Sequence, residues 1–155
     1  MKILLNILFI IFSANLNAQK DKEIEILNAD QTYANDKVHP DYWRLIGNIS
    51  FKHNNTIMYC DSAYHYINQN KIKAFGNVKI FQGDSIKLTG NTLTYFGIEN
   101  KANLIGDVIF NDKYMTLKTQ QIYYNLNSNI AFYPFFGEII DTEKRGYKAV
   151  QIGFG

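Results

Sequence analysis

Apolar and polar residues alternate in short runs along most of the chain. In residues 75–105, three such runs are marked by pairs of apolar residues two positions apart: Val78 and Ile80, Ile86 and Leu88, and Leu93 and Tyr95. A period of two is typical of β-strands that bury one face and expose the other. Gly83–Asp84, Gly90–Asn91 and Gly97 interrupt the runs, and Gly and Asn tolerate the positive φ angles of turns. The stretch therefore predicts three short strands joined by turns.

This unit occurs several times at a nearly constant spacing. Its copies open at Gly47, Gly76, Gly106 and Gly137, which are 29, 30 and 31 residues apart, and the last copy is incomplete. Each copy ends in a turn with an asparagine: Asn70, Asn100 or Asn129. A fixed period of about 30 residues indicates stacked supersecondary units, none of which buries its apolar face alone. We therefore expect an all-β fold of repeated short antiparallel strands.

Aligning the copies predicts which side chains share the buried face. In this alignment Cys60 takes the position of Leu88 and Leu117, and Tyr64 takes that of Leu93. The predicted inner face consists of Ile49, Phe51, Met58, Cys60, Tyr64, Tyr66, Val78, Ile80, Ile86, Leu88, Leu93, Tyr95, Val108, Phe110, Met115, Leu117, Ile122 and Tyr124. Alternation alone leaves two interpretations open: a closed core, which every sandwich needs, or an apolar groove.

One insertion interrupts the regular pattern before the first full copy. It covers residues 35–44 and contains Pro40, so we expect a loop there. Trp43 is expected to cap the first sheet edge, with contact to a partner as the alternative, since loops often carry function.

The N-terminal residues have the pattern of a secretory signal peptide. Lys2 precedes an apolar run over residues 3–12, and Ala18 supplies a small residue for cleavage before Gln19. That run is shorter than the roughly 20 residues that span a bilayer. We expect a signal peptide at residues 1–18 and one exported, soluble domain at residues 19–155.

Charge and reactive side chains narrow the range of functions. The formal net charge is only +2 at pH 7, which gives no basis for nucleic-acid binding. Cys60 is the single cysteine and is interpreted as a small buried hydrophobe. His39, His53 and His65 do not recur between copies, and His65 is expected to face solvent. We therefore expect no catalytic residues, no metal site and no cofactor.

Several stretches resemble a known family when they are taken in their order along the chain. They are I-E-I-L-N-A-D at 24–30, L-I-G-N-I-S-F at 45–51, M-Y-C-D-S-A at 58–63 and F-G-N-V at 75–78. Residues 24–147 resemble the OstA-like, or LptA-like, lipopolysaccharide-transport proteins. One departure is that the strands expected after Gly137 are not clearly restored.

The resemblance implies a half-open β-jellyroll, that is, a two-sheet shell. The implied location is the periplasm, and association with the outer membrane is a further option. It implies that the inner-face residues bind the lipid A acyl chains of lipopolysaccharide. The implied partners are lipopolysaccharide, other transport components reached through the terminal strands, and further copies of the chain stacked head to tail. Together they would bridge the inner and outer membranes. Basic residues on the outer face, Lys52, Lys79, Lys87 and Lys118, are candidates for contact with lipid phosphates, although a solvated face is the default.

Two other classes of protein compete with this interpretation. The first is a secreted structural β-repeat protein, whose inner face is simply a closed core. The second, more distant, is a β-solenoid enzyme that acts on polysaccharide. Such an enzyme needs clustered acids or a calcium site on one face, and the copies show no such cluster.

Overall fold

The computed structural model describes residues 23–35, 37–141 and 146–149. The expected signal peptide at residues 1–18 lies outside these residues. Within the described part, no helix is long and apolar enough to cross a membrane. The expected all-β class is confirmed, because strands account for nearly all of the regular structure.

The strands follow one another as neighbours in a single antiparallel sheet. In the described residues they are β1 (Glu25–Asn28), β2 (Gln31–Asn35), β3 (His39–His53), β4 (Thr56–Tyr66), β5 (Lys71–Gln82), β6 (Ile86–Phe96), β7 (Lys101–Asn111), β8 (Met115–Asn125), β9 (Ile130–Phe132), β10 (Gly137–Asp141) and β11 (Gly146–Ala149). A short 3-10 turn, η1 (Ile67–Gln69), follows β4. The order in the sheet is β1-β3-β4-β5-β6-β7-β8-β10-β11, while β2 pairs with β3 and β9 pairs with β8.

A bulge divides each pair of long neighbouring strands into two halves. The register shifts between Phe75 and Val78 where β5 pairs with β6, and equivalent shifts occur in the pairs from β3 to β8. We call the first part the β10 half: β1, 49–53, 56–60, 78–82, 86–90, 108–111, 115–119, β10 and β11. We call the second part the β9 half: β2, 39–46, 62–66, 71–75, 92–96, 101–105, 121–125 and β9.

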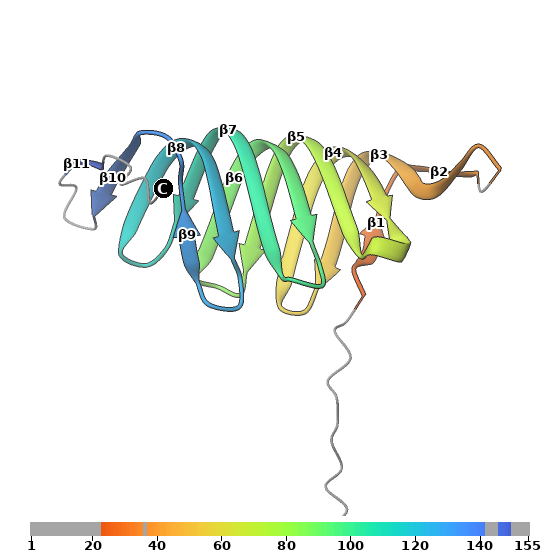
Figure 1. Cartoon of the computed structure of the whole chain (residues 1–155), viewed down its shortest axis with the longest axis horizontal. Coiled ribbons are helices and arrows are strands. Elements are labelled where there is room, and N and C mark those ends of the chain that lie inside the picture. Colours follow the sequence, from red (N-terminus) through yellow and green to blue (C-terminus); the bar gives the residue numbers. More distant parts are fainter. Residues whose placement is uncertain (1–22, 36, 142–145, 150–155) are drawn as a thin grey trace, which may run out of the picture.

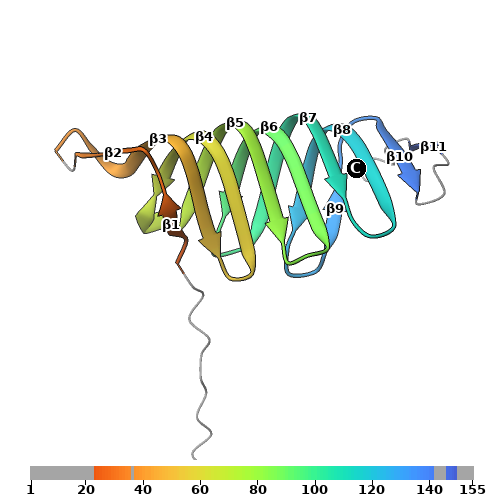
Figure 2. The same ribbon diagram turned by 180° about the vertical axis from the view of Figure 1, so that it is seen from behind.

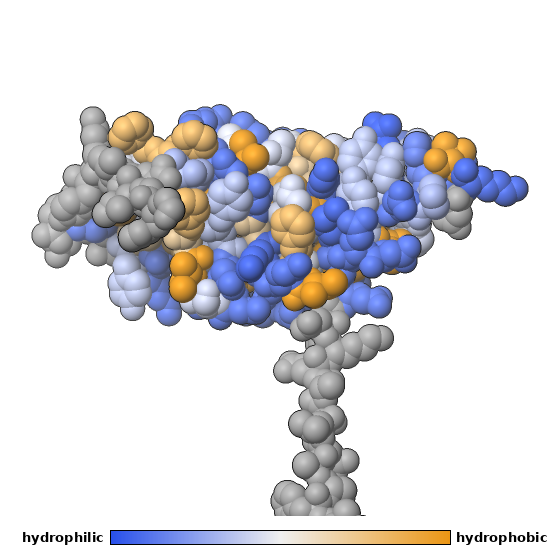
Figure 3. Space-filling view, in the orientation of Figure 1, coloured by the Kyte–Doolittle hydropathy of each residue, from blue (hydrophilic) through white to orange (hydrophobic). Residues whose placement is uncertain are grey.

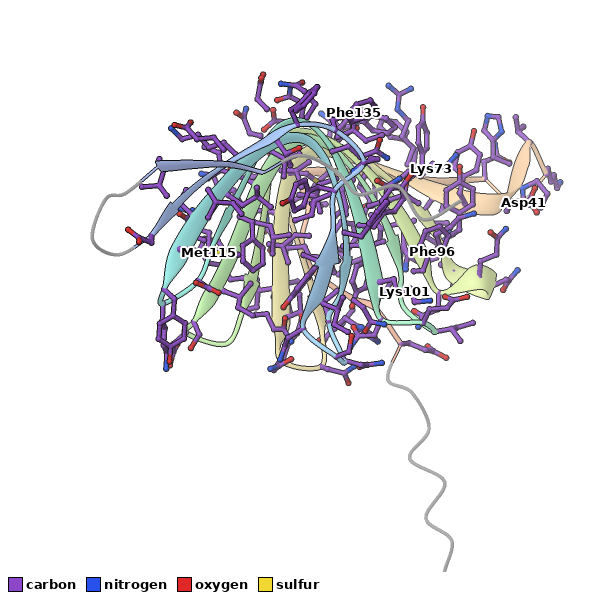
Figure 4. All side chains as sticks on the ribbon, turned by 60° about the vertical axis from the view of Figure 1, so that its left-hand side comes forward. Asp41, Lys73, Phe96, Lys101, Met115 and Phe135 are labelled. Carbon is purple, nitrogen blue, oxygen red and sulfur yellow. The ribbon has the colours of Figure 1, made fainter. Side chains whose placement is uncertain are left out.

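The line of bulges forms a ridge over which the sheet is folded. Figure 1 has β9 and η1 on the near side, and Figure 2, from behind, has β1 and β10 on the near side. Figure 4 shows the arch more nearly end-on, with Met115 on one half and Phe96 and Lys101 on the other. The apolar face of one sheet is thus folded against itself.

Pairs of residues with positive φ produce the bends. Gly76 and Asn77 have φ angles of 77° and 45°, and the same pair of conformations recurs at the openings of two other copies, at 47–48 and 106–107. Asn77 Nδ2 donates a 2.8 Å hydrogen bond to Asp61 Oδ2 on β4. Asn48 donates a 2.8 Å bond to Asp30 in the same way. Each bend is therefore held by a side-chain bond to the neighbouring strand.

Two expectations about the strands were wrong. Each unit contains two long strands instead of three short ones, because Gly90–Asn91 lies inside β6 at the bend. Gly83 and Gly97 do lie between strands, as predicted. The expected loop at 35–44 is mostly strand: β3 starts at His39 and extends along β2, with only a short turn before it.

The Gly76→Ala substitution tests the bend. A Cβ at this position would meet the Asp61 carboxylate, and a φ of +77° strains any residue with a side chain. We expect the free energy of unfolding to fall by about 2–4 kcal/mol, measured by urea denaturation. Gly83→Ala is the control, because its φ is also positive (54°) but nothing lies within 4 Å of the added Cβ. Equal losses in the two variants would contradict the role assigned to the bend.

Candidate lipid-binding interior

Most of the predicted inner-face residues lie in the interior of the arch. The following are buried, with 0–6% of their surface exposed: Ile49, Phe51, Met58, Cys60, Val78, Ile80, Leu88, Leu93, Tyr95, Val108, Phe110, Leu117, Ile122 and Tyr124. Ile86 and Met115 are partly buried and pack against this cluster. Both begin strands of the β10 half, so they lie at the hairpin ends of the arch. Alternation therefore located these positions correctly.

Tyr64 and Tyr66 were placed on the wrong face. Strand pairing aligns Ala63 with Leu45 of β3 and Ala74 of β5, and all three are buried. Tyr64 has the opposite orientation, and its ring packs edge-on against Phe75, which is 38% exposed. The alignment of copies was one residue out of register here.

His65 is the buried residue that this error concealed. It was expected to face solvent, yet only 5% of its surface is exposed. It pairs with Ile72 of β5, which in turn pairs with Tyr95 of β6. These three residues form one row of cross-strand neighbours on the inner face, and we call such a row an inner level. Its Nδ1 atom is buried without a hydrogen-bond partner. Burial lowers the pKa of the His65 imidazole below its usual value.

Cys60 is buried as expected, but its equivalents in the other copies are different residues. Met58, not Cys60, shares a level with Leu88 through Ile80. Burial, with the nearby Asp61 carboxylate, raises the pKa of the Cys60 thiol to about 12, against a weaker opposing bond to Phe75. A thiol with this pKa is protonated at neutral pH and is a poor nucleophile.

Sequence reasoning missed other parts of the inner face. They are Ile24, Leu45, Ala63, Ile72, Ala74, Ala102, Leu104 and Leu126. Several alternate regularly, as in Ile72 and Ala74 or Ala102 and Leu104, so the period of two was a signal that could have found them. Ile72, Ala74, Ala102 and Leu104 follow the Asn turns and belong to the β9 half, whereas Ile24 lies just before β1.

Aromatic rings join the two halves across the interior. Phe51 and His65 lie with ring centroids 5.8 Å apart, and Phe110 and Tyr124 are 5.5 Å apart. In each pair one ring comes from the β10 half and the other from the β9 half. Such pairs contribute about 0.5–1.5 kcal/mol beyond the burial of area. In the described residues, the two halves are therefore in direct contact across the interior.

Polar side chains link the hairpin ends opposite the ridge. We call this group the polar seam, and it consists of His53, Gln82, Tyr95, Asn100 and Tyr124. The Tyr95 hydroxyl donates to Asn100 Oδ1 at 2.6 Å and lies 2.7 Å from His53 Nδ1, which is therefore the donor in that bond. Gln82 Nε2 donates to the Leu126 carbonyl at 2.8 Å, and its Oε1 lies 3.1 Å from the Tyr124 hydroxyl. Hydrogen bonds between the halves thus cross this edge.

The two tyrosines of the polar seam stay protonated at ordinary pH. Burial raises the pKa of the Tyr95 hydroxyl. Burial, followed by the Asp112 carboxylate, raises the pKa of Tyr124 to about 12. The Tyr124 hydroxyl can therefore donate to Gln82 across the seam, and the Tyr95 hydroxyl can donate to Asn100 while it accepts from His53, throughout the physiological range.

The outer surface of the β10 half carries the lysines selected from the sequence. Lys52, Lys79, Lys87 and Lys118 are all exposed. Lys118 Nζ lies 3.7 Å from Glu138 Oε2 on the neighbouring strand, an exposed ion pair of small energetic effect. Among the described residues, no group of three or more His, Cys, Asp or Glu side chains could hold a metal ion.

Comparisons with known proteins agree with this architecture. A family model for OstA-like proteins matches residues 21–148. The chain belongs to the OstA-like protein family. The crystal structure of LptH from Pseudomonas aeruginosa has the same fold, with a TM-score of 0.65 at 17% sequence identity. The match covers 84% of the OstA-like chain and 96% of LptH, which is described as the LptA-homologous periplasmic component of the conserved lipopolysaccharide transport device. Comparison with curated proteins gave no match.

The His65→Leu substitution tests the buried imidazole. Leu removes a nitrogen that lacks a partner, so we expect the free energy of unfolding at pH 7 to rise by about 1 kcal/mol. The folded pKa is lowered, so the unfolded chain binds a proton more readily, and stability falls as the pH drops below the usual value of 6.5. The variant should lose less stability than the wild type between pH 7 and pH 5 in urea titrations. Parallel curves for the two proteins would contradict this assignment.

Proposed function

We propose that this OstA-like chain binds and transports lipopolysaccharide, with the lipid A acyl chains held in the interior of the arch. Membership of the OstA-like family and the fold shared with LptH support the proposal. The same support makes the periplasm the proposed location, reached through cleavage of the segment 1–18. The role is passive and non-enzymatic, since binding is supplied by apolar surface and the driving energy comes from elsewhere.

One observation carries the proposal: a continuous apolar interior is closed along one edge by polar side chains. Levels of similar composition repeat along the arch, as in Phe51, Met58, Ile80 and Leu88 on consecutive strands. Burial of apolar surface is worth about 25 cal/mol per Å², so acyl chains in contact with these levels would be held firmly. Because consecutive levels are nearly equivalent, an acyl chain could move along the arch without meeting one deep minimum of free energy.

The polar seam is the proposed entrance. Its hydrogen bonds join side chains of opposite halves, and each contributes only about 0.5–1.5 kcal/mol net because water replaces it on opening. The ridge, by contrast, is continuous covalent backbone. Separation of the halves at the seam would break these side-chain bonds and the packing of the interior, but no backbone pairing between strands.

The ends of the sheet suit the proposed bridge between membranes. Within the described residues, β1 and β2 at one end and β9 and β11 at the other have a neighbouring strand on one side only. Free strand edges are templates for the addition of another strand. Other transport components, or further copies of the chain, would pair there in a head-to-tail assembly.

A structural repeat protein is the second candidate, and one observation favours it. Residues at the centre of the interior, such as Leu88 and Leu104, have no exposed surface. A tight core of this kind stabilises the fold without any ligand. The two candidates differ in whether the interior opens to lipid in the cell.

Photo-crosslinking at adjacent positions separates the two candidates. A small diazirine side chain replaces Leu88, which points inward, or Lys87, which is exposed on the outer face. We expect a lipopolysaccharide adduct at Leu88 and none at Lys87 after irradiation of living cells, detected by a mobility shift and by antibodies to lipopolysaccharide. The Met115 position, partly buried at the hairpin end, is a second inward site that tolerates change more readily.

The matched outer position makes the result decisive. Adducts at neither inward position, in a protein that is exported and folded, would reject lipid transport in favour of the closed structural core. Adducts at Lys87 but at neither inward position would indicate contact with lipid on the outside only, and equal adducts at Leu88 and Lys87 would contradict a preference for the interior.

The Tyr95→Phe substitution tests the seam as the entrance. Loss of the hydroxyl removes its bonds to His53 and Asn100. If the halves separate at this edge, uptake of a fluorescent lipopolysaccharide should become about fivefold faster, because a bond worth roughly 1 kcal/mol no longer opposes opening. Tyr123→Phe is the control, since Tyr123 faces outward and is 44% exposed. Unchanged uptake in Tyr95→Phe would place the entrance elsewhere.

A further inference from the structure

The outer face of the β9 half has an unusual composition. Its outward residues on β3 to β9 are Tyr42, Arg44, Ile46, Ser62, Tyr64, Tyr66, Lys71, Lys73, Phe75, Thr92, Thr94, Phe96, Lys101, Asn103, Ile105, Gln121, Tyr123, Asn125, Ile130 and Phe132. This set contains four basic side chains, many aromatic ones and no acid. Carboxylates lie at its margins: Asp61 and Asp107 at the ridge, Glu99 in a hairpin turn, and Asp41 on the projecting β2–β3 extension (Figure 4).

Strand register places the basic residues between two aromatic groups. One row runs from Tyr64 through Lys73 to Tyr123 and Phe132. The next row runs from Tyr66 through Lys71, Phe96 and Lys101 to Ile130. Neighbouring strands are about 4.8 Å apart, so the seven strands from β3 to β9 present a face roughly 29 Å wide.

Aromatic side chains on this face contact one another while remaining partly or largely exposed. Tyr42 and Tyr64 have ring centroids 4.9 Å apart, and Tyr123 and Phe132 have centroids 6.0 Å apart. Tyr123 and Phe132 are 44% and 48% exposed. Figure 3 looks onto this face and shows hydrophobic and hydrophilic side chains interspersed. Apolar rings in water without a covering partner mark an interaction surface.

Positive charge on this face also lacks compensation from acids. Lys71 Nζ lies 4.4 Å from the centre of the Tyr66 ring, a cation–π contact that leaves the charge unneutralised. The β10 half differs, because its outer face contains Glu25 and Glu138, and Glu138 pairs with Lys118. The outer face of the β10 half also has rings, with Tyr59 packed edge-on against Phe81 and Lys87 Nζ 5.7 Å from the centre of the Phe81 ring. The two outer faces therefore differ in their acids.

We propose that the outer face of the β9 half lies against the anionic headgroup surface of a membrane. Lysine and arginine are attracted to anionic lipids, and aromatic side chains favour the boundary between headgroups and acyl chains. A small soluble anion would satisfy the charges but leave rings such as Phe96 and Phe132 exposed. A second copy packed on this face would oppose Lys71, Lys73 and Lys101 with like charges and no acid to pair with them.

This contact does not depend on what the interior binds. It would hold the arch flat on a bilayer with the polar seam and both terminal edges of the sheet accessible. A lipid-filled interior and a closed core are equally compatible with it, so the test below and the crosslinking test above succeed or fail separately.

The proposal is tested by measuring how the purified protein binds to lipid vesicles. The protein is used in the form that cells export, which we expect to begin at Gln19. We expect binding to vesicles of phosphatidylcholine mixed with phosphatidylglycerol, little binding to phosphatidylcholine alone, and release at high salt. The triple variant Lys71→Gln, Lys73→Gln, Lys101→Gln should bind the mixed vesicles about a hundredfold more weakly, since each basic side chain near an anionic surface contributes roughly fivefold.

A variant of the opposite face is the matched control. Lys79→Gln, Lys87→Gln and Lys118→Gln removes the same charge from the outer face of the β10 half. It should keep most of the wild-type binding, and circular dichroism verifies that both triple variants fold. Equal losses in the two variants would show attraction by net charge and would overturn the assignment of this face.

The exposed rings provide an independent measurement. Phe96→Ser combined with Phe132→Ser should also weaken vesicle binding, with the residual attraction still sensitive to salt. Absence of wild-type binding, or equal binding to neutral and anionic vesicles, would overturn the proposal. Self-association in the absence of lipid that the Phe96→Ser, Phe132→Ser variant abolishes would assign the face to a second copy instead.

Discussion

The structure depends on the burial of one apolar sheet face against itself. A single antiparallel sheet with one apolar face needs a second layer, and in the described residues no helix or separate sheet supplies it. The sheet therefore bends, and its long strands bend at the same level so that pairing continues on both sides. Residue pairs such as Gly76–Asn77 permit this because both residues adopt positive φ, while the Asn77 side chain bonds to Asp61 of the neighbouring strand along the ridge.

The edge opposite the ridge is held differently. Its two sides are joined by side chains such as Tyr95 and Gln82, whose hydrogen bonds exchange readily with water, whereas the ridge is backbone. An arch with one strong edge and one weak edge suits the proposed entry of an elongated apolar ligand from the side. The buried imidazole of His65 lies on the same inner level as Tyr95, so polar groups are concentrated near the edge that would open.

The two outer faces extend this division of roles. Both outer faces carry lysines and rings, but the β10 half adds carboxylates such as Glu138, whereas the outward residues of the β9 half on β3 to β9 include no acid. Since both faces belong to the same strands, each long strand contributes to two chemically different surfaces and to the interior. Period-two alternation allows this, because the bend lets one strand serve two layers.

Much of this was determined by the sequence alone. Alternation and the 30-residue period predicted the all-β class, the Asn turns and most of the interior, although not the number of strands in a unit, because these features depend on local preferences and on which residues are apolar. Gly83 and Gly90 look alike in the sequence, yet one lies between strands and the other lies within a bent strand. Gly83 adopts a positive φ of 54° and Gly90 does not, and continued pairing of β6 with β5 and β7 decides between the two roles. The inward orientation of His65 likewise depends on register with β3 and β5, which fixes the face of every residue in β4.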